Sequence, residues 1–251
     1  MSNRKIMPNV TDQDYTDVVN DILGDLPSID YVEVKLPSLG MGLYQLEDSV
    51  VHLRPMTFED EKSLMSLKDK TQSLNHLLSK CLKEEINPRT LLLQDKLLLL
   101  HHLRAISVDK DYIVQIQCPN CRKISEITID LLDTFPCKYA ETPIPRTVEI
   151  TLPTIKKKAK VKVLTSGELE DNPNIMFEHL WKFLVEIDGK DNPVVRTKVI
   201  EKLPRKDIHE IIKAAIQGDV GLDTRFNFVC SYCKHESLEQ VEIDADFFIS
   251  A

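Results

Sequence analysis

The chain has 251 residues, a formal net charge of −8 and 42% hydrophobic residues, enough apolar sequence for one or two folded domains. It contains no run of 18 apolar residues and no N-terminal signal pattern, so we predict a protein without a membrane span that is made in a cytoplasm. The acidic charge argues against a nucleic-acid-binding protein, because such proteins gain affinity mainly by neutralising phosphates.

Residues 1–30 are polar and acidic, and we predict that they form an N-terminal arm. The spacing of the apolar residues over 16–23 indicates a short helix, whose apolar face would contain Val18, Val19, Ile22 and Leu23. We expect the arm either to lie on a partner or to be mobile alone.

A strand-and-helix unit is predicted to follow. Alternating apolar residues predict two strands, at 31–36 and 50–54, on either side of a Pro/Gly-rich loop. Helical periodicity predicts a helix that begins at Thr57, a second over 72–83 and a third over 88–107. In the first helix we expect a buried face of Phe58, Leu64, Met65 and Leu67.

The third helix is rich in leucine over most of its circumference. We predict that Asn87 caps it with Pro88 at its first position. It is either a central core helix or one that keeps an apolar face for a partner. Asp95 and His102 lie two turns apart and resemble a catalytic or metal pair, but no third ligand is apparent. A salt-bridge network within the helix is the favoured interpretation.

Two C-x-x-C sequences each stand between strand-like runs. The first joins runs at 112–117 and 124–131, and the second joins runs at 225–229 and 238–243. Each therefore predicts the tip of a β-hairpin. The residues of these two cysteine knuckles are Cys118 and Cys121 in the first and Cys230 and Cys233 in the second.

A zinc ion needs four soft or borderline ligands in a tetrahedron, and two facing C-x-x-C tips supply them as thiolates. We therefore predict one four-cysteine zinc-ribbon site. The usual ribbon separates its two pairs by about 15–20 residues. Here residues 122–229 intervene, so a whole subdomain would be inserted between the two hairpins.

Other interpretations of the cysteines compete with zinc. Disulfides are disfavoured because the chain carries no secretory signal. A redox C-x-x-C normally opens a helix, whereas the run after Cys121 alternates as a strand. The cysteines could also be unliganded, and His235 could replace one thiolate. Cys81 falls on a helical pattern and is predicted to be a core residue.

The intervening sequence predicts an α/β subdomain over 137–221. Its first residues, 137–146, are rich in Pro and turn formers and mark the best candidate boundary. A hairpin is predicted around a lysine-rich solvated loop at 156–160. Helices are predicted over 174–187, 196–202 and 204–217, and Phe247-Phe248-Ile249 is predicted to be a last apolar anchor.

The order of these signals resembles the phage T4-type baseplate proteins. The resemblance lies in Val34-Lys35-Leu36-Pro37-Ser38-x-Gly40, in Leu53-Arg54-Pro55-Met56-Thr57, in the leucine-rich helix with Asp95 that leads to a C-P-x-C knuckle, and in the closing Leu203-Pro204-x-x-Asp207, C-x-x-C and Asp246-Phe247-Phe248. It implies a hub component, or a factor that helps the hub assemble, in a contractile-tailed phage. The long acidic arm departs from a simple small hub protein.

We therefore predict an α+β fold with an acidic arm (1–30), a strand-plus-helical unit (31–111), a composite zinc ribbon (112–136 with 222–251) and an inserted α/β subdomain (137–221). No phosphate loop, nucleophile elbow or H-E-x-x-H motif occurs, so no catalysis is predicted. The resemblance implies other baseplate and tail proteins as partners, with homo-oligomers as a further expectation. It also implies a location in the host cytoplasm during assembly and then in the virion tail. A zinc-ribbon transcription factor or other nucleic-acid-binding protein is the alternative.

Overall fold

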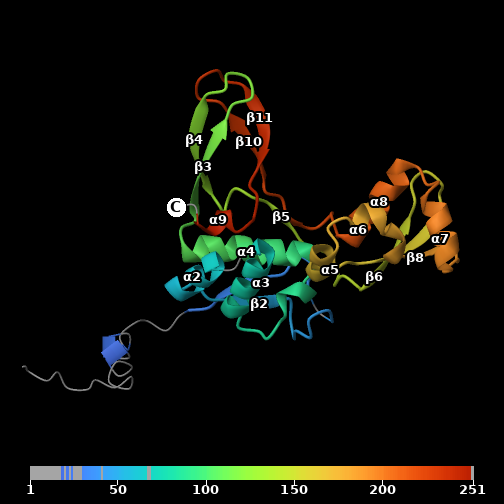
Figure 1. Cartoon of the computed structure of the whole chain (residues 1–251), viewed down its shortest axis with the longest axis horizontal. Coiled ribbons are helices and arrows are strands. Elements are labelled where there is room, and N and C mark those ends of the chain that lie inside the picture. The colour runs from blue at the N-terminus through green and yellow to red at the C-terminus, as the bar shows by residue number, and fades with distance from the viewer. Residues whose placement is uncertain are drawn as a thin grey trace, which may run out of the picture. The chain divides into compact units, whose positions relative to one another are not determined.

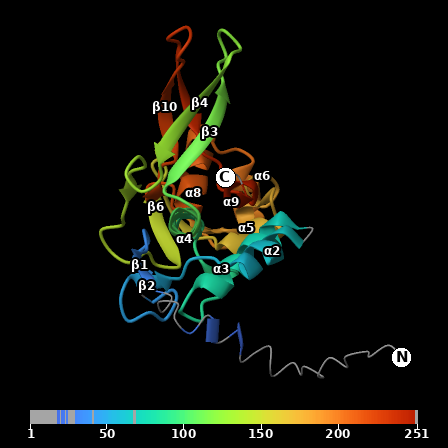
Figure 2. The ribbon, with the colours of Figure 1, turned by 90° about the vertical axis from the view of Figure 1, so that its left-hand side faces the viewer.

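The computed structural model describes residues 30–249 except 41, 67 and 68, together with positions 18, 19, 21, 22 and 24. The chain divides into two compact units, residues 1–30 and 31–251 (Figures 1 and 2). The predicted helix over 16–23 falls partly outside the described residues. All further elements belong to the second unit.

The second unit begins with an antiparallel strand pair and two helices. Val34 lies opposite Val51 in the pair, and both side chains are buried. The carboxylate of Asp60 accepts hydrogen bonds from the backbone N–H of Thr57 (2.8 Å) and from the side chain of Arg54 (2.6 Å). The bond to Thr57 satisfies a backbone N–H at the helix N-terminus, which explains why the first helix begins directly after Thr57. The elements are β1 (Val32–Lys35), β2 (Val50–Leu53), α2 (Phe58–Ser66) and α3 (Lys70–Cys81).

The predicted buried face of α2 is largely wrong. Phe58 and Met65 are 71% and 60% exposed, whereas Leu64 is buried. Leu67 lies outside the described residues. A short helix at the surface buries only one stripe, and helical spacing places Phe58 and Leu64 on different sides of it.

The predicted helix over 88–107 is divided in two. Asn87 caps a short 3₁₀ helix, η1 (Pro88–Thr90), and the α-helix proper is α4 (Leu93–Ser107). Leu91 and Leu92 between them are extended, because their backbone groups bond elsewhere. The carbonyl of Leu91 accepts from the N–H of Ser166 (2.7 Å), and the N–H of Leu92 donates to the hydroxyl of Tyr44 (2.8 Å).

The α4 helix is the central core helix, one of the two predicted roles. Its surplus leucines are covered by other elements of the same unit, including α3, β1, β2 and the end of the chain. They therefore do not support the alternative that α4 keeps an apolar face for a partner. The buried leucines on or just before α4 are Leu91, Leu92, Leu98, Leu99, Leu100 and Leu103.

Both cysteine hairpins are present. The first consists of β3 (Asp111–Gln117) and β4 (Ile124–Asp130), and the second of β10 (Arg225–Val229) and β11 (Glu236–Gln240). The two lie side by side in Figures 1 and 2, and residues next to their tips share one small apolar cluster. Ile116 and Phe228, one from each hairpin, are buried against each other beneath the tips.

A two-residue strand pairing lies where the chain leaves the first hairpin and where it returns to the second. It joins β5 (Cys137–Lys138) to β9 (Gly221–Leu222). The residues between these strands form a three-stranded antiparallel sheet of order β6-β7-β8 with its own core. The strands and helices between β5 and β9 are β6 (Thr147–Thr151), β7 (Lys158–Lys162), α5 (Ser166–Asp171), α6 (Ile175–Glu178), η2 (Leu180–Lys182), β8 (Leu184–Ile187), α7 (Pro193–Ile200) and α8 (Arg205–Ala215).

The helix predicted over 174–187 is wrong beyond its first turn. The observed helix, α6, ends at Glu178, and Leu184–Ile187 is instead strand β8, paired with β7. The open edge of β7 supplies backbone partners that local helical periodicity does not reveal. Asp188 and Gly189, both with positive φ, then form the turn that ends β8.

Two further details of this sheet differ from the prediction. Part of the expected lysine loop lies inside β7, where Lys158 and Lys160 pair with Glu149 and Glu186 (2.7 Å each). Helix α5 was not predicted, although its capping box of Thr165 and Glu168 is visible in the sequence.

The chain's last described helix, α9 (Asp246–Ile249), confirms the predicted C-terminal anchor. Phe247 and Phe248 are buried in the main core. Arg104 donates from Nε to the carbonyl of Phe247 (2.9 Å), so α4 also holds the backbone of α9. Helices and small sheets alternate throughout, which confirms the mixed α and β composition. None of the described helices is long and apolar enough to cross a membrane.

Candidate metal centre

The first knuckle is a tight turn in which the backbone, rather than the side chains, sets the positions of the cysteines. The N–H of Cys118 donates to the carbonyl of Lys123 (3.0 Å), and the N–H of Arg122 donates back to the carbonyl of Cys118 (2.9 Å). Arg122 has a φ of 58°, in the left-handed region. This residue reverses the chain, so the sulfurs of Cys118 and Cys121 point to the same side.

The second knuckle repeats this geometry. The N–H of Cys230 donates to the carbonyl of His235 (2.9 Å), and the N–H of Lys234 donates to the carbonyl of Cys230 (3.0 Å). Lys234 has a φ of 60°, equivalent to that of Arg122. Two segments more than a hundred residues apart in the chain thus form the same turn, which is the pattern expected of paired metal-binding tips.

The four sulfurs of the two knuckles form one cluster. They all lie within 4.8 Å of one another, and the contacts across the hairpins are 3.6 Å from Cys118 to Cys233 and 3.7 Å from Cys121 to Cys230. Four thiolates at about 2.3 Å from a tetrahedral zinc ion are separated by about 3.8 Å. A disulfide would need about 2.05 Å, and all four cysteines are free thiols. The spacing therefore fits a shared ion.

The electrostatics of the cluster are uneven. The backbone N–H groups of Cys233 and Tyr232 lower the pKa of Cys230 to about 6, and the N–H of His235 lowers the pKa of Cys233. The N–H of Lys123 also lowers the pKa of Cys121, but burial and the neighbouring thiols outweigh it and raise that pKa to about 11. The backbone thus favours the thiolate form at Cys230 and Cys233, and a bound cation would favour it further.

Polar and apolar contacts around the cluster hold the two tips together. Asn120 donates to the sulfur of Cys233 (3.6 Å), and the hydroxyls of Ser125 and Ser231 lie 3.1 Å apart across the hairpins. Cys118 and Cys230 are fully buried. Cys121 is half-buried and Cys233 is exposed, so the cluster is buried on one side only.

The structure also bears on the competing interpretations. Each knuckle leads into a strand, β4 or β11, and neither opens a helix as a redox C-x-x-C normally does. His235 is not a member of the cluster, in which Cys233 supplies its own sulfur. Cys81 is buried in the main core, as predicted, and burial raises its pKa to about 12.

Asp95 and His102, the other candidate pair, do not interact. Asp95 accepts hydrogen bonds from Ser38 and Tyr44, and Nδ1 of His102 lies 3.2 Å from the carbonyl of Leu98. The predicted salt-bridge network within α4 is therefore wrong. The true partners of Asp95 are Ser38 and Tyr44, and both lie in the Pro/Gly-rich loop predicted from the sequence.

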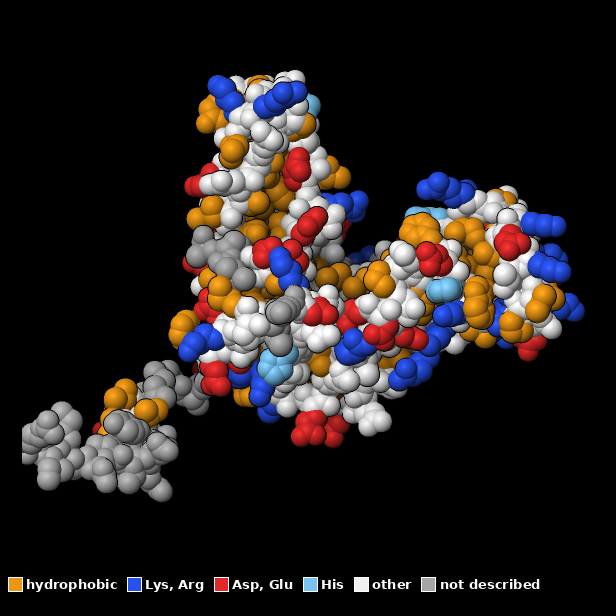
Figure 3. Space-filling view, in the orientation of Figure 1, with side chains coloured by type: hydrophobic (Ala, Val, Ile, Leu, Met, Phe, Trp, Pro, Cys, Tyr) orange, Lys and Arg blue, Asp and Glu red, His pale blue; other side chains and the backbone are white. Residues whose placement is uncertain are grey.

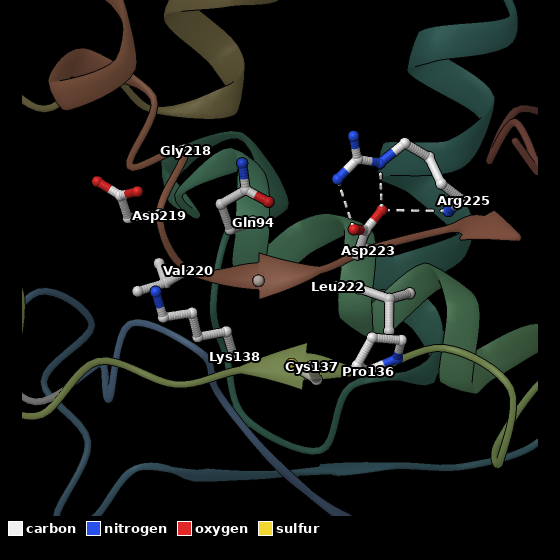
Figure 4. A pocket seen from close by; sticks show the side chains of 11 residues that line it. Gln94, Pro136, Cys137, Lys138, Gly218, Asp219, Val220, Leu222, Asp223 and Arg225 are labelled. Atoms are coloured by element: carbon white, nitrogen blue, oxygen red, sulfur yellow. Dashed lines mark hydrogen bonds and ion pairs between the residues drawn. The ribbon is translucent and has the colours of Figure 1, made fainter. Parts of the chain in front are cut away.

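A hollow of about 510 Å³ beside the β5–β9 ladder was not anticipated from the sequence (Figure 4). Its charged side chains include Asp223 and Arg225, which pair with each other at 2.6 Å, and Asp219, which pairs with Lys213 at 2.6 Å. Apart from Lys138, the charged side chains that line the hollow are thus paired with each other or with a neighbouring residue.

Comparison with known proteins bears on the predicted resemblance. The family model described as T4 bacteriophage base plate protein matches residues 28–249, which include both knuckles, α4 and the C-terminal anchor. Searches of curated proteins and of solved structures found no significant match. Because the family model covers most of the chain, the chain belongs to the T4 bacteriophage base plate protein family.

Proposed function

We propose that this protein is a non-catalytic structural component, or an assembly factor, of the base plate hub of a contractile-tailed phage. It would act through contacts with other base plate and tail proteins. Family membership supports a base plate role. The observation that carries the proposal is the meeting of two distant hairpins at one cluster of four sulfurs.

We propose that Cys118, Cys121, Cys230 and Cys233 hold one structural zinc ion. The sulfur separations favour a site in which all four ligands come from the protein. Such a site has no open position for a water or a substrate, so the ion would stabilise the fold rather than catalyse a reaction. Thiolates also suit iron, so the metal itself has to be measured.

The zinc would fix the chain at both ends of a long excursion. Residues 131–224 begin and end at the two hairpins. We propose that the arm (1–30), the helical unit (31–111), the ribbon (112–136 with 222–251) and the insert (137–221) act as the chain's structural units, with the ribbon placing the insert against the helical unit. A rigid arrangement of this kind suits a protein that orients partners.

The role would be exercised in the host cytoplasm while the hub assembles, and afterwards in the tail base plate. Co-expression of the tagged chain with hub and wedge proteins should yield a discrete complex. A Cys118→Ser variant should form less of it, whereas Cys137→Ser, a cysteine outside the cluster, should leave its yield unchanged. Complete base plates from phage that lack the gene, together with no retained tail protein, would contradict the proposal.

One observation favours the alternative of nucleic-acid binding. The hairpin tips carry exposed cations at Arg122, Lys123 and Lys234, and Lys123 stacks over the exposed ring of Tyr232 at 4.6 Å. The acidic net charge opposes this alternative. A mobility-shift titration at physiological salt should show only weak binding, and submicromolar, sequence-selective binding would favour the alternative.

A further inference from the structure

A shallow groove of about 430 Å³ lies beside α7, on the inserted part of the chain. Four aliphatic side chains, which we call its floor, and two lysines line it. We call it the α7 groove, and its lining residues are Ile155, Val195, Lys198, Val199, Lys202 and Leu203. Figure 3 shows hydrophobic side chains interleaved with lysines and arginines over this part of the chain.

Helix α7 contributes unusually little to the core. None of its eight residues is buried, and Val194 and Val195 are 62% and 39% exposed. The helix is nevertheless held in place, because Asn192 caps its N-terminus and Arg196 donates to the carbonyls of Trp181 and Leu184. A well-anchored helix that leaves Val194 and Val195 in solvent is typical of a surface that another segment covers.

The lysines of the groove are available for a partner. Lys198 and Lys202 are exposed, and neither forms an ion pair within the part of the chain that the structure describes. They are four residues apart, Lys198 in the last turn of α7 and Lys202 just beyond the end of the helix. Glu201 lies between them in sequence but does not line the groove. The groove therefore fits an amphipathic segment with acidic residues one turn apart.

The N-terminal arm contains a segment of this chemistry. Val18, Val19 and Ile22 are 57%, 49% and 69% exposed. Their spacing places them on one face of a helix, and the same spacing places Asp17 and Asp21 one turn apart beside that face. The arm thus has an uncovered apolar face with an acidic flank, and the groove has an uncovered apolar floor with a basic flank.

We propose that residues 16–23 of a second copy of this chain bind in the α7 groove as a helix. The valines and Ile22 would cover the apolar floor, while Asp17 and Asp21 would lie beside Lys198 and Lys202. Burial of the apolar side chains drives the contact, and the charges set its orientation. The self-association depends neither on the zinc ion nor on any other base plate protein.

Sedimentation of the full-length chain over a range of concentrations tests the proposal. The chain should associate reversibly, and higher salt should weaken the association. The double variant Lys198→Glu/Lys202→Glu should weaken it about tenfold or more, because two attractive contacts become repulsive. The control Lys80→Glu/Lys190→Glu changes the net charge equally at exposed lysines outside the groove, and it should associate like the wild type. Circular dichroism should show that both variants are folded.

A second test reverses the charges of the arm in one copy of the chain and those of the groove in another. Asp17→Lys/Asp21→Lys should weaken association to a similar degree, since the arm of each copy then repels the groove of the other. A mixture of this arm variant with the Lys198→Glu/Lys202→Glu variant should associate again, because each arm then meets a groove of opposite charge.

The proposal is overturned if the groove variant (Lys198→Glu/Lys202→Glu) or the arm variant (Asp17→Lys/Asp21→Lys) associates as strongly as the wild type. It is also overturned if the mixture of these two variants stays monomeric. A wild-type chain that is monomeric at all concentrations also overturns it, and the groove would then be free for a segment of another protein.

Discussion

Ser38 donates both its backbone N–H and its hydroxyl to the carboxylate of Asp95, at 2.9 and 2.5 Å, across 57 positions of the chain. The hydroxyl of Tyr44 donates to the same carboxylate at 2.6 Å. Asp95 is fully buried in α4. Burial raises the pKa of Asp95, while these hydrogen bonds oppose that rise. The loop after β1 is thus attached to the central helix by three hydrogen bonds on one side chain.

Replacement of Asp95 by Ala should lower the free energy of unfolding by about 3 kcal/mol, because it leaves the buried donors of Ser38 without an acceptor. Tyr44→Phe should also destabilise the protein, since it removes one of the three donors to the carboxylate and the acceptor of the Leu92 N–H. Urea denaturation measures both. The two effects should combine to less than their sum, because the residues share one network. A loss below about 1 kcal/mol for Asp95→Ala would contradict this account of the loop.

Protein purified without added metal should contain about one zinc per chain by elemental analysis, because a closed site of four thiolates binds its ion tightly. Removal of the metal with a chelator should loosen both hairpins, which hydrogen exchange in β3 and β10 would detect. Cys233→Ser should lose the metal and Cys137→Ser should retain it. Metal-free protein with a disulfide within either C-x-x-C would instead indicate redox chemistry.

A buried ion pair joins α4 to α5. Lys96 of α4 lies 2.5 Å from Glu170 of α5, and their side chains are only 7% and 13% exposed. Glu170→Gln should destabilise the protein by about 3 kcal/mol in urea denaturation, because it leaves the Lys96 ammonium buried without a counter-charge. Addition of Lys96→Met should recover part of the loss.

The matched control for this ion pair is the exposed pair of Lys158 and Glu149, which are 73% and 49% exposed. Glu149→Gln should cost less than about 1 kcal/mol. Equal losses for the Glu170 and Glu149 variants would show that burial does not set the strength of the Lys96 pair.

His101 should make the protein sensitive to acid. It is buried between the rings of Phe135 and Phe247, and neither of its ring nitrogens has a hydrogen-bond partner among the described residues. Burial lowers the pKa of His101 to about 4, from 6.5 in the unfolded chain. The unfolded state therefore binds more protons between these values, so stability falls as the pH drops from about 6.5 to about 4, by about 3 kcal/mol.

His101→Phe should remove this part of the pH dependence, because the phenyl ring fills the site and does not titrate. His76→Gln changes an exposed histidine and should keep the wild-type dependence. Thermal unfolding of the three proteins at pH 4.5 and 7.5 provides the comparison. An unchanged pH dependence in His101→Phe would show that other groups cause the acid sensitivity.

The sequence alone was sufficient for the two cysteine hairpins, the strands β1 and β2, and most of the helices, because their signals are local. Alternating apolar residues specify a strand wherever one face is buried. A C-x-x-C between two such runs specifies a tight turn whichever partner it meets. The meeting of the two knuckles could also be expected, because a lone knuckle provides only two ligands for an ion that needs four.

Tertiary structure decided the features in which contacts with a distant segment overrode the local conformational preference of the sequence. Leu184–Ile187 became a strand because β7 offered an open edge, and the helix predicted from 88 was interrupted because Tyr44 and Ser166 bind the backbone at Leu91 and Leu92. The partners of Asp95 and Lys96 come from segments 57 and 74 positions away. Helical periodicity reports which face of an element is apolar, but it carries no information about which distant segment will satisfy a buried polar group.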